Sequence, residues 1–447
     1  MKTYQDLVKV GESETERMAF VLRVINEHKT SPAYKIATDA EMYYKHLNPT
    51  IMKAQKLVYD LMGQAHVDAW ASNTKIPCRY YFYLITQAVQ FLLGNGVSFN
   101  EASTKDKLGK GFDYSIQKAA TNAMNGGVSF GFWDDDHLTV FAITEFAPLF
   151  DEENGALRAG IRFWQIDQSK PLRATLYEED GYTEYIRREG EDIEVLAPKR
   201  RYVLRVGVSQ ATGTEIYDGY NYESFPVVPL WNTNRQSEIV GIRETIDAYD
   251  LMASALVNNI DDANIIYWVI RNAGGMDDVD DQKVIQRLKT LHVVHTDGEE
   301  QVDVHNVNVP FEASETALNR LRSQLFDDFM GLDVKDIAAG AVTATQIEAA
   351  YEPLNSKADL FEHEVTKFID SILQLVGIDD EPTYTRSMIV NQQEMVQVLA
   401  SAGEYLSTNY ITRKILEVMG DIDKTEEVME DRMKEEMARY IVAEQMQ

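Results

Sequence analysis

The run Asp134-Asp135-Asp136-His137 gathers carboxylate and imidazole groups, which are ligands for divalent cations in proteins. Short apolar runs of β-strand type lie on both sides of it, so the pattern predicts a hairpin turn at this position. Acidic residues are ordinary in such turns because water solvates them there. We therefore favour a solvated turn over a metal site.

Two other groups have ligand-type side chains but unsuitable spacing. His292 and His295 are three apart on a predicted strand, where their side chains point to opposite faces and cannot readily bind one ion. The acidic stretch from Asp277 to Asp281 lacks the glycine and the closing glutamate of a calcium loop. We expect no metal ion and no cofactor.

The familiar sequence patterns of enzyme active sites are also missing. The chain has no Walker phosphate loop, no dinucleotide-type glycine cluster, no Gly-x-Ser-x-Gly elbow and no cysteine pair. Scattered carboxylates could form a hydrolase pair, but sequence spacing cannot test the distance between them. We therefore assign no catalytic residue, and an acidic metal-dependent hydrolase stays as the enzyme alternative.

The charge balance limits how this protein can handle nucleic acid. With 72 acidic and 43 basic residues the formal net charge is -29, which is commonly a matter of solubility alone. A protein that binds DNA tightly needs Lys and Arg to replace the counterions of the phosphates. An acidic wall can instead let DNA slide past without adhering. Composition does not decide between simple solubility and such a passive surface.

Length, cysteine content and hydropathy bound the class of protein. A chain of 447 residues predicts two to four structural units. Its one cysteine, Cys78, cannot form an internal disulfide, and the first 20 residues lack the apolar core of a signal peptide. The apolar runs fall short of the roughly 20 residues that cross a bilayer. We expect synthesis in a reducing cytoplasm and no membrane contact.

The elements follow an α+β order. The first quarter is predicted to be mainly helical, and residues 128–228 carry short β-like runs separated by turn residues, which indicates an antiparallel β region. A long helix is predicted from 236 to 264 because apolar or small residues recur at alternating spacings of three and four. The stripe consists of Ile239, Ile242, Ile246, Tyr249, Ala253, Leu256 and Ile260.

A small α/β insertion and a returning helix come next. Strands are predicted at 265–270, 291–295 and 302–309, with a short helix at 279–288. The returning helix, 313–330, carries Leu318, Leu321 and Leu325 on one face. After a weakly patterned segment at 332–342, a very long helix is predicted from 344 to 376, with a kink near Pro353 because proline removes a backbone donor. The tail from 391 is predicted to be helical.

Several local stretches carry a family resemblance when taken in this order. They are Asn73-Thr74-Lys75-Ile76-Pro77, Asp247-Ala248-Tyr249, Ser254 with Asn258, and Tyr405-Leu406-Ser407. The chain resembles the portal proteins of long-tailed bacteriophages, especially those of phages of Gram-positive bacteria. The resemblance covers roughly residues 35 to 437, and the order of the motifs carries it.

The resemblance implies the portal fold and its domain order. Residues 1–235 would form the wing, 236–264 and 313–331 the two stem helices, and 265–312 the clip inserted between them. Residues 332–343 would form the tunnel loop, 344–380 the kinked wing helix and 381–447 a helical crown.

The resemblance also implies a function and partners. The chain would form a dodecameric ring at one capsid vertex, a channel for packaging and ejection of double-stranded DNA without sequence specificity. It would contact the large terminase, a head-tail adaptor, the scaffold and the major capsid protein. It would be assembled in the host bacterial cytoplasm and end in the virion. The competing class is another ring-forming phage neck or scaffolding protein.

Two sets of site residues follow from these domain assignments. The tunnel loop would comprise Val334, Lys335, Asp336, Ile337, Ala338, Ala339, Gly340, Ala341 and Val342. Lys335 is the only basic residue between Gly331 and Thr343, and it either faces DNA or is a solvated loop lysine. The clip would dock a packaging motor or a tail-side adaptor through acidic residues that otherwise are simply solvated: Asp277, Asp278, Asp280, Asp281, Asp297, Glu299 and Glu300.

Overall fold

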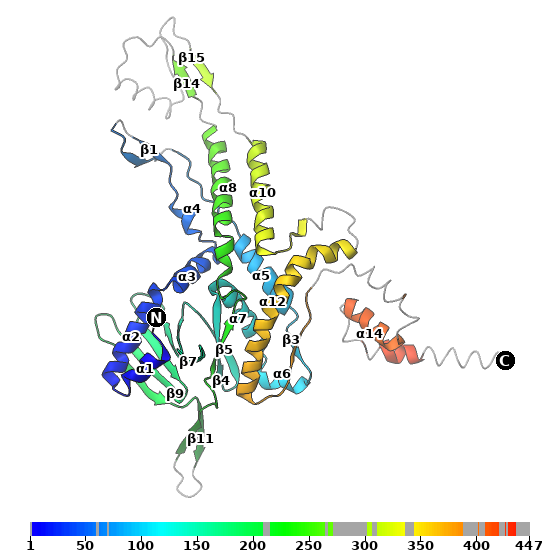
Figure 1. Cartoon of the computed structure of the whole chain (residues 1–447). Helices are drawn as coiled ribbons and strands as arrows, with labels where there is room; N and C mark the ends of the chain where they lie inside the picture. The colour runs from blue at the N-terminus through cyan, green and yellow to red at the C-terminus, as the bar shows by residue number, and fades with distance from the viewer. Residues whose placement is uncertain are drawn as a thin grey trace, which may run out of the picture.

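The computed structural model is a mixed helix and sheet structure whose strand pairs are antiparallel (Figure 1). It describes residues 2–59, 62–68, 71–208, 215–263, 267–270, 302–305, 311–335, 344–387, 401, 407–419, 425 and 428–434. In this part of the chain, no helix is long and apolar enough to cross a membrane. The predicted α+β class is therefore confirmed at the level of mixed helix and sheet.

Four helices open the chain, as the first quarter of the sequence predicts. They are α1 (Tyr4–Val10), α2 (Glu14–Thr30), α3 (Pro32–Tyr44) and α4 (Pro49–Lys53). Helices α3 and α4 each begin at a proline that follows a capping residue. Ser31 and Asn48 accept main-chain N–H bonds in the first turn, and the proline after each has no N–H to satisfy. A hairpin that the sequence did not predict follows: β1 (Leu57–Tyr59) and β2 (Ala65–Val67).

The next elements build the larger core. They are α5 (Tyr80–Leu93), β3 (Val97–Phe99), α6 (Ala102–Leu108) and α7 (Phe112–Gly126). The apolar helix α5 is buried along most of its length, and α7 ends where Gly127 takes a left-handed φ of 82°. These helices pack with α12, described below, against one face of a three-stranded sheet.

The predicted β region is confirmed and divides into two sheets and a hairpin. The three-stranded sheet has the order β13-β4-β5 and comprises Val227–Trp231, Val128–Asp134 and His137–Ala142. The five-stranded sheet is a meander of β6 (Phe146–Phe150), β7 (Leu157–Trp164), β8 (Leu172–Glu178), β9 (Gly181–Arg187) and β10 (Glu194–Arg200). Helices α1 and α2 cover the meander and share its core. The hairpin β11 (Val203–Val208) and β12 (Glu215–Tyr220) projects from the body.

Two antiparallel helices stand out of the body on the opposite side (Figure 1). They are α8 (Arg243–Ala263) and α10 (Phe311–Phe329), and strands β14 (Tyr267–Ile270) and β15 (Val302–His305) pair beyond their far ends. The predicted helix from 236 is interrupted: a 3-10 turn, η1 (Glu238–Gly241), precedes α8, and the Ser237 side chain caps that turn.

The long helix α12 (Ala344–Val376) has the predicted bounds and contains Pro353. Figure 1 shows it as a bent helix that runs from the base of the α8–α10 pair down the body. The resemblance assigned residues 381–447 to a helical crown, but Pro382–Tyr384 forms a strand, β16, that pairs with β3. Asp380 holds this segment in place, since its carboxylate accepts the N–H groups of Asn100 and Glu101. Helix α14 (Thr408–Met419) lies farther along the chain.

Candidate functional site

The acidic run at 134–137 lies at the β4–β5 turn, where the sequence places it. Asp134 and His137 are cross-strand partners, and the His137 ring Nδ1 lies 2.7 Å from the Asp136 carboxylate. Asp135 has a φ of 50°, as tight turns often require. Within the described residues, no group of three or more His, Cys, Asp or Glu could hold a metal ion. The hairpin-turn prediction is confirmed.

The predicted apolar stripe on α8 is covered only near the body. Ile239, Ile242 and Ile246 are buried, and Leu325 on α10 is buried beside them in the same core. The middle of the stripe is half-buried: Tyr249, Ala253 and Leu256 on α8 with Leu318 and Leu321 on α10. At the far end, Ile260 is 43% exposed. The pair of helices therefore leaves an apolar surface uncovered by its own described chain.

An extended segment, residues 72–78, runs along a second face of α8. The N–H groups of Cys78, Ile76 and Thr74 donate to Asp250 Oδ1 at 2.8 Å, Ser254 Oγ at 3.0 Å and Asn258 Oδ1 at 2.8 Å. Two residues of extended chain span about 6.6 Å, and four residues of helix rise about 6 Å. The two repeats match, so every second N–H finds a side chain four residues farther along α8.

We call the three bonds from Cys78, Ile76 and Thr74 to α8 the ladder. The end of the ladder nearest the body meets a buried polar cluster. The amide of Asn48 donates to Asp250 Oδ2 at 2.8 Å and to Asp247 Oδ1 at 3.0 Å. The hydroxyls of Tyr43 and Thr50 donate to Asp247 at 2.6 and 2.9 Å. Burial raises the pKa of Asp250, and burial with the Asp247 bond raises the pKa of Tyr43 to about 12. The cluster fixes α8 to the N-terminal helices.

A second set of contacts holds the chain that leaves α10. Gln87 on α5 exchanges bonds with the main chain of Leu332, donating to its carbonyl at 2.9 Å and accepting from its N–H at 2.9 Å. The Asp333 carboxylate pairs with Arg322 at 2.6 Å and accepts the Lys335 N–H at 3.0 Å. The Lys335 side chain is exposed. The start of the predicted tunnel loop is therefore fixed to the base of the helix pair.

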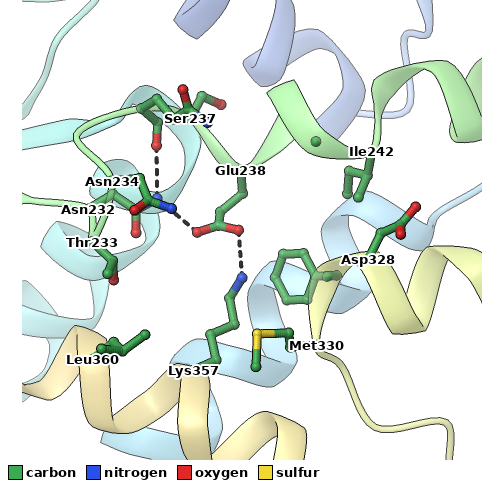
Figure 2. Close-up of a pocket in the computed structure, with 13 residues that line it drawn as sticks. Asn232, Thr233, Asn234, Ser237, Glu238, Ile242, Asp328, Met330, Lys357 and Leu360 are labelled. Atoms are coloured by element: carbon green, nitrogen blue, oxygen red, sulfur yellow. Dashed lines mark hydrogen bonds and ion pairs between the residues drawn. The ribbon is translucent and has the colours of Figure 1, made fainter.

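A pocket of about 220 Å³ lies at this base, between η1, the end of α10 and α12 (Figure 2). Lys357 of α12 pairs with Glu238 at 2.5 Å and lies 3.8 Å from the centre of the Phe329 ring. The Asn232 amide donates to the same carboxylate at 2.8 Å. Lys357 therefore neutralises Glu238, and the contacts around this pocket join η1, α10 and α12.

The rest of the predicted site residues lie outside the described residues. In the loop these are Asp336, Ile337, Ala338, Ala339, Gly340, Ala341 and Val342, while Val334 is described and exposed. In the insertion they are Asp277, Asp278, Asp280, Asp281, Asp297, Glu299 and Glu300, together with His292 and His295.

Sequence reasoning did not identify the ladder or its polar cluster. The motifs at 73–77, 247–249, 254 and 258 were noted only for their order along the chain, yet the structure brings them together. Asn48 and Asp250 were not noted as site residues. The available signal was the spacing of Asp250, Ser254 and Asn258 at four-residue intervals, which places three polar side chains on one face of α8.

Comparison with known proteins gives a consistent result. The family model described as phage portal protein, SPP1 Gp6-like, matches residues 22–442. The portal protein of Clostridium phage phiCD119 is 26% identical over 360 residues, covering 74% of this chain and 77% of the relative. The portal protein of Bacillus phage SPP1 is 22% identical over 427 residues, covering 88% and 80%. A chain in the structure titled "Virion of native gene transfer agent (GTA) particle" matches with a TM-score of 0.44 and 10% identity, covering 76% of this chain and 90% of that chain.

Proposed function

Since the chain belongs to the SPP1 Gp6-like family of phage portal proteins, we propose that it forms the channel at one capsid vertex through which double-stranded DNA is packaged and ejected. The family is structural rather than enzymatic, and its members form a capsid-associated ring in the virion. The match over residues 22–442 favours this assignment over the neck-protein, scaffolding and hydrolase alternatives.

One structural observation supports the ring in particular. The α8–α10 pair stands out of the body with its base buried and with the apolar residues Val257, Ile260 and Phe311 exposed at its far end. Exposed apolar surface of this kind costs free energy in water and is typical of a face that a second protein covers. Neighbouring copies in a ring would provide that cover, and we propose twelve copies.

The domain roles are part of the proposal. Residues 1–235 and 344–380 would form the wing, α8 and α10 the stem, 265–312 the clip and 332–343 the tunnel loop. The resemblance placed the crown at 381–447, but we propose that it begins after β16, because Pro382–Tyr384 pairs with β3 of the wing.

The partners are proposed on the same basis. The acidic clip residues would dock the large terminase and later the head-tail adaptor, while the wing and crown would meet the scaffold and the major capsid protein during assembly in the host cytoplasm. DNA would pass without sequence-specific contacts. With a formal charge of -29 on each subunit, the ring would be a passive conduit whose wall repels phosphate.

Electron microscopy of the purified protein tests this function. We expect closed rings with a central hole wide enough for a DNA duplex. A particle that stays a compact monomer at high concentration, or that assembles without a central hole, would overturn the proposal.

A further inference from the structure

The β1–β2 hairpin lies apart from the body as an arm, which we define by the described residues 54–59, 62–68 and 71–72 (Figure 1). Leu57 and Val67 are direct cross-strand partners in this hairpin, and their side chains are 50% and 54% exposed. A two-stranded hairpin of three residues per strand is marginal on its own in water. An exposed apolar pair on such a hairpin indicates that another surface covers it.

The ladder sets the position of the arm along α8. Two bonds attach the C-terminal end of the arm to α8: the Ser72 hydroxyl donates to Asp261 at 2.6 Å, and the Thr74 N–H donates to Asn258 at 2.8 Å. The Lys75 ammonium donates to the carbonyl of Ala54, which ties the two ends of the arm together. Asp261 lies in the last turn of α8, so the arm belongs to the far end of the helix pair.

A matching apolar surface lies at the same far end, on the other side of the stem. Phe311, the first residue of α10, is 51% exposed, and Ile260 on α8 is 43% exposed. Figure 1 shows the arm on one side of α8 and α10 on the other. Ile260 follows Asn258 by two residues, about 200° around a helix with 3.6 residues per turn. The arm is therefore held on the face of α8 opposite Ile260, so the arm of the same chain does not cover Ile260.

Rotational symmetry brings the two surfaces together. In a closed ring, each contact joins different surfaces of adjacent copies, and rotation about the ring axis leaves the height of every residue unchanged. With the stem along the axis, as the function proposed above requires, an arm beside Asp261 meets the neighbour at the height of the neighbour's own stem end. We propose that the Leu57–Val67 arm of each copy packs on Phe311 and Ile260 of the next copy.

Disulfide trapping in the assembled ring tests this contact. The variant combines Val67→Cys and Phe311→Cys in a Cys78→Ser background, and the rings are oxidised mildly before a non-reducing gel. Each copy then offers one thiol to each neighbour, so we expect a ladder of covalent multimers that extends to the full ring. Single-cysteine variants have no complementary thiol and should give no such ladder.

A matched control uses an apolar residue that is even more exposed but lies on the body. Ile166 in the β7–β8 connection is 88% exposed, and the pair Ile166→Cys with Phe311→Cys should stay monomeric on the gel. Rings that form normally but give no Val67–Phe311 ladder overturn the arm contact and leave the portal assignment intact. An internal disulfide within one chain also overturns it. If wild-type protein forms no ring, the proposed function fails first and the arm contact fails with it.

Charge substitution gives an independent measurement. Leu57→Asp with Val67→Asp should raise the protein concentration at which half the rings dissociate by about tenfold, because two apolar side chains lose their cover. Ile166→Asp is the matched surface change and should leave that concentration unchanged. Equal effects from both variants, or no effect from the first, contradict the proposal.

Discussion

At the scale of single residues, Asp250 connects three segments of the chain. Its carboxylate accepts the Asn48 amide and the Cys78 N–H, and both bonds are withdrawn from water. Asp250→Ala removes the acceptor of the Cys78 N–H and one of the two acceptors of the Asn48 amide, which should lower the free energy of unfolding by roughly 2–4 kcal/mol. Asp192→Ala, at an exposed carboxylate, should change it by less than about 0.5 kcal/mol. Urea unfolding compares the two, and equal losses would contradict the role given to Asp250.

Buried His28 gives a pH-dependent prediction. The ring Nε2–H donates to the Ile143 carbonyl at 2.7 Å, and burial lowers the pKa of the ring. The folded protein then binds fewer protons than the unfolded chain once the pH falls below about 6.5, so stability is lost as the pH drops from there toward the lowered pKa. The His28→Gln variant keeps a side-chain N–H donor for the Ile143 carbonyl but has no titrating group. We expect wild type to lose more stability than His28→Gln between pH 7.5 and pH 5.5 in thermal unfolding.

Lys335 carries the prediction about DNA. Its main-chain N–H is fixed by Asp333 while its side chain is exposed. If the ammonium meets passing phosphates, Lys335→Glu should reduce nuclease-protected DNA in particles a few-fold without affecting ring assembly. Lys335→Arg should retain packaging, and Lys170→Glu on the body should have no effect. Normal packaging by Lys335→Glu rings would make Lys335 a solvated loop lysine.

At the scale of elements, the contact between α12 and the three-stranded sheet depends on a missing side chain. A Cβ at Gly131 of β4 would lie 2.5 Å from the ring of Phe368 on α12, and that ring is buried. Gly131→Ala should therefore force the helix off the sheet and lower the free energy of unfolding by about 1–3 kcal/mol. Gly241→Ala, where a Cβ meets open space, is the matched control and should be close to neutral. The midpoints of denaturant unfolding of the two variants, compared with wild type, test this prediction. Equal midpoints for the two variants would contradict it.

At the scale of the whole molecule, net charge decides how the ring treats DNA. With -29 on each subunit, few phosphate contacts are available to release counterions. Purified rings should bind duplex DNA no more tightly than the non-specific range, with Kd of about 10⁻⁴ M or weaker at physiological salt. Fluorescence anisotropy with a labelled duplex measures this. A nanomolar Kd at that salt concentration would contradict a passive conduit.

The sequence by itself determined the order and type of most elements. The spacing of apolar residues is a local property, so it predicted the β region, the turn at Asp134–His137, the helices of the stem and the bounds of α12. These features follow from residues that are neighbours in the chain, whose side chains fall on one face whatever the rest of the fold does.

Only the tertiary structure decided which distant segments meet. The Cys78 N–H and Asp250 are 172 positions apart, and β16 pairs with β3 although no local pattern predicted a strand at residues 382–384. A local pattern shows that a face is apolar or polar, but it does not encode the register of a distant partner. The same limit applies to the predicted stripe of α8: the sequence predicted one continuous apolar face, whereas in the described part of the chain the end with Ile239 and Ile246 is buried and Ile260 is 43% exposed.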